Sequence, residues 1–148
     1  MFVWKPIVSR WANQVFVTQT FARWHWGVGR PDYADAWIEQ TGPLSQTERS
    51  AADGLRAALR RNDGAALLRA LLPFATGEEG EASARAVWSA GDFSTWEAAR
   101  DAFAPRFDRL WADGEPALAR KAELLGAHPP AWLIPAMAAT DHFFGVDS

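Results

Sequence analysis

The chain has 148 residues, of which 49% are hydrophobic and 22% are charged, and its formal charge is −3. This length allows one domain with a sizeable core, and the composition excludes a disordered or fibrous chain. The acidic balance argues against a nucleic-acid binder, and the absence of cysteine excludes disulfides, thiolate nucleophiles, iron–sulfur clusters and cysteine zinc sites.

The first residues predict an extended arm. Residues 2–9, FVWKPIVS, are rich in β-branched and aromatic side chains, but Pro6 lacks the N–H that a central strand needs. We therefore expect an extended arm over residues 1–12. This segment does not have the pattern of a secretory signal, and no stretch of the chain is long and apolar enough to span a bilayer. A soluble, cytoplasmic protein is the resulting expectation.

A helix is predicted from Asn13 onward. Apolar side chains recur there at spacings of four, three and four residues, which places them on one helix face: Val17, Phe21, Trp24 and Val28. The start of this helix is open, because residues 15–17, Val-Phe-Val, are also typical of a strand. A short second helix is predicted to begin at Pro31 and to bring Tyr33 and Trp37, four residues apart, to one side.

The middle of the chain carries clear helix boundaries. Residues 45–48, Ser-Gln-Thr-Glu, form a capping box that predicts a helix start, and residues 62–64, Asn-Asp-Gly, predict its end. A short helix follows over residues 65–72. Residues 76–83, TGEEGEAS, are polar and contain two glycines, so we expect a mobile loop there.

The last third predicts helices interrupted by prolines. A modest helix covers residues 84–90, and residues 94–97, Ser-Thr-Trp-Glu, predict a second capping box. Pro105 is expected to kink or divide the helix that follows, and Pro116 to begin another. The apolar residues 131–145 predict a buried, kinked helix. The expected fold is all-α: a single domain of about six to eight helices with an extended N-terminal arm.

The stretch Trp24-His25-Trp26 resembles a functional site more than any other part of the chain, but its geometry favours a role in packing. On a helix the two tryptophans point about 200° apart, so they do not form a cage around the imidazole. The glycines that follow lack the third glycine of a dinucleotide-binding turn and predict a helix end. Arg30 stands directly before a helix start, where it could help to hold an anion.

No catalytic, metal or cofactor motif is complete. The three histidines, His25, His128 and His142, lack the spacing of a metal-binding motif, although the fold could bring them together. No metal site and no cofactor are therefore predicted. Arg49, Arg56 and Arg60 share one helical stripe, and we interpret them as a solvated outer face in preference to a binding row for phosphates or an acidic partner.

Nine tryptophans are the remaining functional signal. Six of them lie on or near apolar stripes, whereas Trp4, Trp11 and Trp26 do not. Tryptophan is favoured at interfaces because its ring is apolar while its N–H can meet a polar partner. We predict a non-catalytic binding or interaction module with an aromatic surface around the arm and the first two helices. Its candidate binding residues are Trp4, Trp11, His25, Trp26 and Arg30, and its expected partner is another protein or a second copy.

Two alternatives belong to other functional classes. The chain could be the N-terminal helical part of a larger hydrolase, metal-dependent or not, whose catalytic motif lies beyond Ser148. The apolar Phe143-Phe144 near the end of the chain favours this interpretation. The chain could also bind a small apolar ligand in a pocket between proline-kinked helices, where gaps in packing arise.

Overall fold

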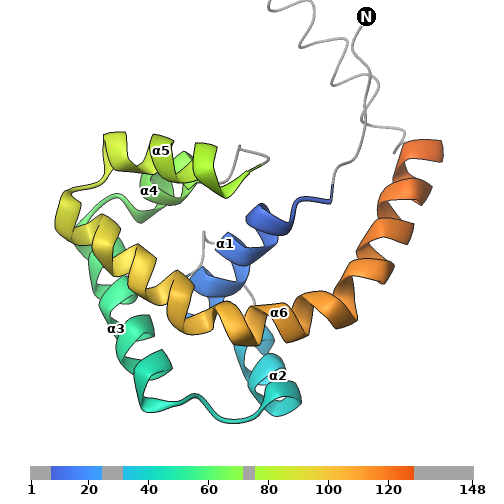
Figure 1. Ribbon diagram of the computed structural model, residues 1–148, viewed down its shortest axis with the longest axis horizontal. Coiled ribbons are helices and arrows are strands. Elements are labelled where there is room, and N and C mark those ends of the chain that lie inside the picture. The colour runs from blue at the N-terminus through green and yellow to red at the C-terminus, as the bar shows by residue number, and fades with distance from the viewer. Residues whose placement is uncertain (1–7, 25–31, 72–75, 129–148) are drawn as a thin grey trace, which may run out of the picture. The chain divides into compact units, whose positions relative to one another are not determined.

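A computed structural model describes residues 8–24, 32–71 and 76–128 (Figure 1). These residues form six α-helices and no strand, which confirms the all-α prediction. The helices are α1 (Arg10–Phe21), α2 (Asp32–Thr41), α3 (Gln46–Arg61), α4 (Gly64–Leu71), α5 (Gly77–Val87) and α6 (Ala90–Ala127).

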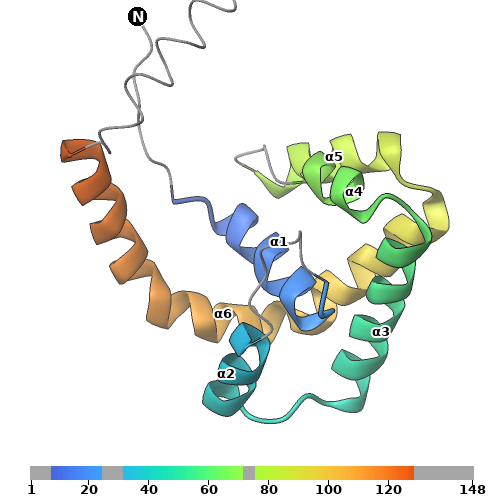
Figure 2. The ribbon, with the colours of Figure 1, turned by 180° about the vertical axis from the view of Figure 1, so that it is seen from behind.

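Ser9–Asp113 form one compact unit, which holds the first five helices and the first part of α6. Within this unit α1 packs against α2, α3 and α4, and α4 also packs against α3 and α5. The opposite views in Figures 1 and 2 both show α1 in the middle of these helices. The remainder of α6, from Gly114 to Ala127, belongs to a second unit, in which Leu118 and Leu124 are exposed.

Serine hydroxyls cap the starts of α3 and α1. The Ser45 hydroxyl accepts the N–H of Glu48 (3.1 Å) and the Glu48 carboxylate accepts the N–H of Ser45 (2.7 Å), so the predicted capping box is confirmed. The Ser9 hydroxyl accepts the N–H of Ala12 (3.1 Å) in the same way. This cap begins α1 at Arg10, so the predicted arm over residues 1–12 is wrong at its last three positions. Residues 1–7 lie outside the described residues.

The mobile loop predicted over residues 76–83 is wrong, because this segment is the N-terminal part of α5. The Thr76 hydroxyl caps the helix by accepting the N–H of Glu79 (3.3 Å), and two glutamates in the first turn favour the positive end of the helix dipole. The two glycines allow Trp11 to pack closely against α5 and do not form a turn. A Cβ at Gly80 would lie 2.5 Å from Nε1 of Trp11 and 2.9 Å from the carbonyl oxygen of Leu71.

Two predicted features of the last third are also wrong. The cap of α6 is Ser89, whose hydroxyl accepts the N–H of Asp92 (3.2 Å), whereas Ser94 lies inside the helix. Nor do Pro105 and Pro116 start or divide helices, because α6 continues through both. A proline inside a helix costs about 3 kcal/mol. Buried aromatic side chains stand two residues before and after Pro105, and their packing outweighs that cost: Phe103 and Phe107.

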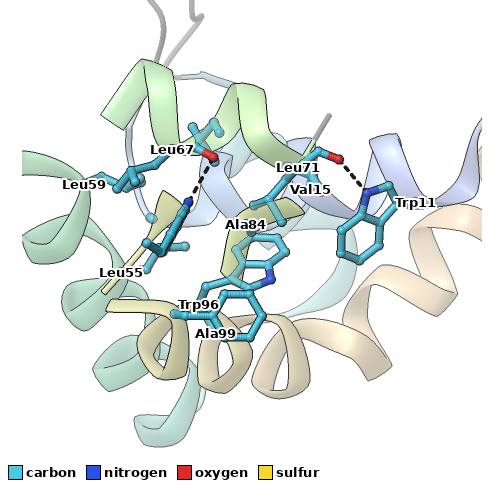
Figure 3. Close-up of a cluster of buried hydrophobic side chains, with 13 residues drawn as sticks. Trp11, Val15, Leu55, Leu59, Leu67, Leu71, Ala84, Trp96 and Ala99 are labelled. Atoms are coloured by element: carbon cyan, nitrogen blue, oxygen red, sulfur yellow. Dashed lines mark hydrogen bonds between the residues drawn. The ribbon is translucent and has the colours of Figure 1, made fainter. Parts of the chain in front are cut away.

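The core of the first unit is built around indole rings (Figure 3). Trp96 is fully buried and meets Trp11 and Trp88 edge to face, with ring centroids 6.0 and 6.4 Å away. The indole N–H of Trp11 donates to the carbonyl of Leu71 (2.7 Å), and that of Trp88 donates to the carbonyl of Leu67 (3.1 Å). Trp11 of α1 and Trp88 of the α5–α6 connection therefore bind the backbone of α4 through hydrogen bonds as well as through apolar contacts.

A buried ion pair joins α6 to the start of α3. Arg106 is 3% exposed, and its Nε and Nη2 donate to the two carboxylate oxygens of Glu48 at 2.8 and 3.0 Å. Its Nη1 donates to the Thr41 hydroxyl and to the Gly42 carbonyl (2.7 Å), and Nη2 also donates to the Pro43 carbonyl (3.1 Å). All five N–H groups of the guanidinium are thus used. They hold the connection between α2 and α3 in place.

The close contact at Gly80 predicts a large effect from one added methyl group. We expect Gly80→Ala to lower the free energy of unfolding by about 1–3 kcal/mol, because the methyl group must displace Trp11 or the backbone of α4. Gly91→Ala is the matched control, since a Cβ there meets nothing within 4 Å. Denaturant unfolding of both variants measures the difference. Equal stabilities would show that Trp11 can move away at no cost.

The buried pair also predicts a pH dependence of stability. The hydrogen bonds from Arg106 hold the pKa of Glu48 below its ordinary value of 4.5, although burial acts in the opposite direction. The stabilisation is therefore complete above that ordinary value and is lost as the pH falls through the lower pKa of the folded state. We expect Glu48→Gln to reduce stability by about 3–5 kcal/mol at neutral pH, because it leaves a buried guanidinium without its counter-charge.

Unfolding measured between about pH 5 and about pH 2 tests this dependence. The wild-type chain should lose more stability than Glu48→Gln over this interval. Glu39→Gln, which changes an exposed glutamate of α2, should follow the wild-type profile. Parallel profiles for the wild type and Glu48→Gln would contradict the expectation.

Candidate interaction surface

The structure describes one of the five residues predicted to bind a partner. Trp11 is only 7% exposed, and its indole N–H is taken up by the carbonyl of Leu71. It is therefore a core residue, and it offers little ring surface to a partner. The other four, Trp4, His25, Trp26 and Arg30, lie outside the described residues.

Three other rings form an exposed cluster on α1 and α2, which we call the aromatic patch: Phe16, Tyr33 and Trp37. Phe16 is 41% exposed and Tyr33 is 45% exposed, while Trp37 is half-buried. Large apolar side chains exposed next to one another are more informative than single ones, because they mark surfaces that can bind a partner.

The rings of the aromatic patch support one another. Tyr33 and Trp37 are one helical turn apart on α2, and their rings stack with centroids 5.8 Å apart and planes 17° apart. Phe16 of α1 stands edge-on to both, at 6.4 Å from Tyr33 and 6.1 Å from Trp37. Because each ring contacts the other two, the cluster is a preformed pad and contains no open cage for a cation.

Trp37 connects the aromatic patch to the core. The ring of Trp37 contacts Phe21 (5.8 Å), which stacks on Phe103 of α6 at 4.7 Å with planes 6° apart. The guanidinium of Arg106 also lies over the ring of Phe21, 5.7 Å from its centroid. The same arginine that holds the α2–α3 connection therefore also packs beneath the aromatic patch, and rotation of Trp37 is restricted.

Polar contacts flank the aromatic patch along α2. Arg23, after the end of α1, binds both carboxylate oxygens of Asp35 at 3.2 and 2.5 Å. These hydrogen bonds hold the pKa of Asp35 below its ordinary value. Gln40, one turn after Ala36, donates to the carboxylate of Asp113 on α6 (3.2 Å). An apolar centre with a polar rim is the usual composition of a protein interface.

Two ring substituents of the aromatic patch can donate hydrogen bonds. Among the described residues, neither the Tyr33 hydroxyl nor the Trp37 indole N–H has a protein partner, and Tyr33 is 45% exposed. The indole N–H groups of Trp11 and Trp88, by contrast, bind backbone carbonyls. The aromatic patch thus combines apolar faces with donors that can satisfy a partner's carbonyl groups.

A groove of about 470 Å³ lies elsewhere on the first unit, between α1, α5 and α6. Its lining is Arg10, Trp11, Gln14, Gly77, Glu81 and Arg100. Arg100 is paired with Glu81 and Asp101, and Arg10 is paired with Asp108 at 2.5 Å. Since its charged groups already meet opposite charges, the groove is explained by ion pairs that join three helices.

Titratable groups with perturbed pKa values are also explained by ion pairs. Arg106 and Arg61 hold the pKa values of Glu48 and Asp92 below their ordinary values, as Arg23 does for Asp35. Structural ion pairs shift pKa values in this way without any catalytic role. No group of three or more potential metal ligands occurs within residues 8–24, 32–71 and 76–128. Of the three histidines only His128 is described, and it is exposed at the end of α6.

The arginine row of α3 contributes to packing. Arg56 donates to the carbonyl of Ala22 (2.7 Å), which follows the last residue of α1, and Arg61 pairs with Asp92 (2.7 Å) at the start of α6. Cations that meet the carbonyl end of a helix are stabilising. Arg56 of the row and the adjacent Arg61 therefore join α3 to its neighbours, while Arg49 and Arg60 are exposed.

Comparison of the chain with protein-family models, with curated proteins and with solved structures gave no match. In the described part of the chain, no helix is both long and apolar enough to cross a membrane. The function must therefore be argued from the surface itself.

Sequence reasoning did not identify Phe16 and Tyr33 as candidates, although signals for both were present. Phe16 lies off the apolar stripe that contains Val17 and Phe21, so on a helix it points away from the core. Tyr33 was paired with Trp37 by spacing alone. That spacing does not reveal that α1 brings a third ring to the same place.

The exposure of the aromatic patch predicts that its outer rings add little to stability. We expect Phe16→Ala and Tyr33→Ala each to lower the free energy of unfolding by about 1 kcal/mol or less, which is the range of single aromatic contacts. Phe21→Ala, which removes the fully buried ring beneath them, should cost about 3–5 kcal/mol. Denaturant unfolding compares the three. A large loss from either outer ring would mean that the patch exists for folding.

Proposed function

We propose that this protein is a non-catalytic interaction module that binds a partner protein through the aromatic patch. The observation that carries the proposal is the exposure of Phe16 and Tyr33 beside Trp37 in a preformed, mutually stacked cluster. Tyrosine and tryptophan are the residues most enriched in the energetic centres of interfaces, because they bury a large rigid area and lose little conformational entropy on binding.

The anchoring of the aromatic patch supports the same function. A surface that is already ordered binds more tightly than one that must be ordered by the partner. Trp37 is held by Phe21, and Phe21 is held by Phe103 and Arg106. The aromatic patch is therefore pre-organised on α1 and α2, the two helices on which an aromatic binding surface was expected.

The alternative functions have less support. The groove between α1, α5 and α6 is lined by two arginines and a glutamate, and such a lining does not suit a small apolar ligand. The hydrolase alternative places its catalytic motif beyond Ser148, and no group of potential metal ligands in the described ranges adds support to it.

Selection from a random-peptide display library against the whole 148-residue chain tests the proposal. We expect the selected peptides to lose at least about tenfold in affinity when Phe16 and Tyr33 are both changed to alanine. Val87→Ala is the matched control, because Val87 is 56% exposed on α5, away from the aromatic patch. Peptides that bind the double variant as well as the wild type, with both proteins folded by circular dichroism, would refute the proposal.

A further inference from the structure

We infer that α2 is an acid-released segment: it detaches from the first unit when Glu48 is protonated, while α1, α3, α4, α5 and the first part of α6 stay packed. This inference does not depend on the proposed function. It rests on three features of the structure, which are the absence of α2 from the indole core, the way in which the end of α2 covers Arg106, and a hinge directly after the helix.

The indole core is complete without α2. Its buried apolar side chains come from α1, α3, α4, α5, α6 and the segments next to them, and none comes from the described residues of α2 (Figure 3). Ala34 is the one buried side chain among those residues, and ring contacts of Tyr33 and Trp37 attach the helix to α1. In Figures 1 and 2, α2 lies at the edge of the unit opposite to α4 and α5. A segment with few buried contacts opens first, so α2 can open while the indole core stays intact.

The buried charge of Arg106 drives the release. Arg106 is 3% exposed, and the carboxylate of Glu48 neutralises it at 2.8 Å. Protonation of Glu48 leaves a buried guanidinium without a counter-charge, and this cost disappears once water reaches the guanidinium. Because α3 and α6 both belong to the indole core, the cover that can move away is the end of α2, where the Thr41 hydroxyl and the Gly42 carbonyl accept from Nη1 of Arg106.

Among the described residues, Arg106 of α6 is the charged group that faces Glu48. Ser45 binds the same carboxylate within the capping box of α3 and is neutral. Phe21 of α1 and the Pro43 carbonyl, which face Arg106 from its other neighbours, are neutral as well. The charge balance of this buried site therefore depends on Glu48, whose pKa is held below its ordinary value of 4.5 by the hydrogen bonds from Arg106.

Two exposed carboxylates also attach α2, and they act in the same direction with smaller effect. Asp35 of α2 pairs with Arg23, and Asp113 of α6 accepts from Gln40 of α2. Protonation of either carboxylate weakens the attachment of α2. Because both bonds are exposed, their partners then bind water instead, and no buried charge is left uncompensated.

A hinge lies directly after α2. Gly42 has a φ of +94°, in the left-handed region that glycine adopts without strain, and its N–H donates to the Ile38 carbonyl (2.8 Å) at the end of the helix. Two residues later the Leu44 carbonyl accepts from Arg49 of α3. The connection is thus tied to α3 at Leu44, and the release is confined to the residues before it. Because a helix of 10 residues is not stable alone in water, released α2 also loses its helical hydrogen bonds.

Nuclear magnetic resonance of the full chain between about pH 7 and about pH 2 tests the inference. The indole signal of Trp37 is assigned by its absence from Trp37→Phe. We expect the amides of α2 and the Trp37 indole to lose their folded signals at a pH at least about half a unit higher than the core amides of Leu55 and Leu59. In Glu48→Gln, which keeps the cap of α3, the α2 amides should exchange hydrogen at least about tenfold faster than in the wild type at neutral pH, while Leu55 and Leu59 keep their folded signals.

Glu39→Gln is the matched control, because it removes an exposed carboxylate of the same helix and should follow the wild type. Asp35→Asn should speed the exchange of α2 less than Glu48→Gln does, since Arg23 remains within reach of water. Loss of the α2 and core signals at one and the same pH in the wild type would overturn the inference, and so would α2 signals that outlast those of the core. If Glu48→Gln does not fold, the order of the two transitions in the wild type decides.

Discussion

The hydrogen bonds of Arg106 determine how the first unit is put together. One guanidinium satisfies both oxygens of Glu48, the Thr41 hydroxyl and two carbonyls of the α2–α3 connection, and its face packs on Phe21. Glu48 in turn completes the capping box of α3. A buried charge is costly unless its donors are used, and this network ties α6 to the start of α3 and to the α2–α3 connection. Thr41, the last residue of α2, is part of it.

A second constraint operates on the other side of α1. The Trp11 ring lies against Gly77 and Gly80 at distances that exclude any side chain there, and its N–H bonds the backbone of α4. Together the two constraints place α1 in the middle of its unit, with one face against the indole core and another toward α2. Phe16 projects on the α2 side, between these buried faces and solvent, which is why it completes an exposed cluster with Tyr33 and Trp37.

The proposed function depends on the groups that remain exposed after the helices have packed. Trp11 and Trp88 donate their indole N–H groups to backbone carbonyls, whereas the N–H of the fully buried Trp96 has no partner, and Arg61 and Arg100 pair with carboxylates of neighbouring helices. The aromatic patch differs because its rings are held while its outer faces and donors stay accessible. This exposed and ordered cluster of rings is the basis of the proposed binding function.

The sequence by itself determined the helical class, the capping box at Ser45 and the spacing that brings Tyr33 next to Trp37, because these depend on residues within four positions of one another. The predictions for residues 76–83 and for Trp11 were wrong for the same reason. Two glycines in a polar stretch indicate a loop, but here the indole of Trp11, some 65 residues earlier in the chain, packs on them within a helix. Pro105 does not divide α6, and the residues two positions before and after it, Phe103 and Phe107, are buried. Tertiary structure alone decided that Trp11 is internal and that Phe16 joins Tyr33 and Trp37 at the surface. Contacts between distant helices, and the network of Arg106 that orients them, leave no local pattern in the chain.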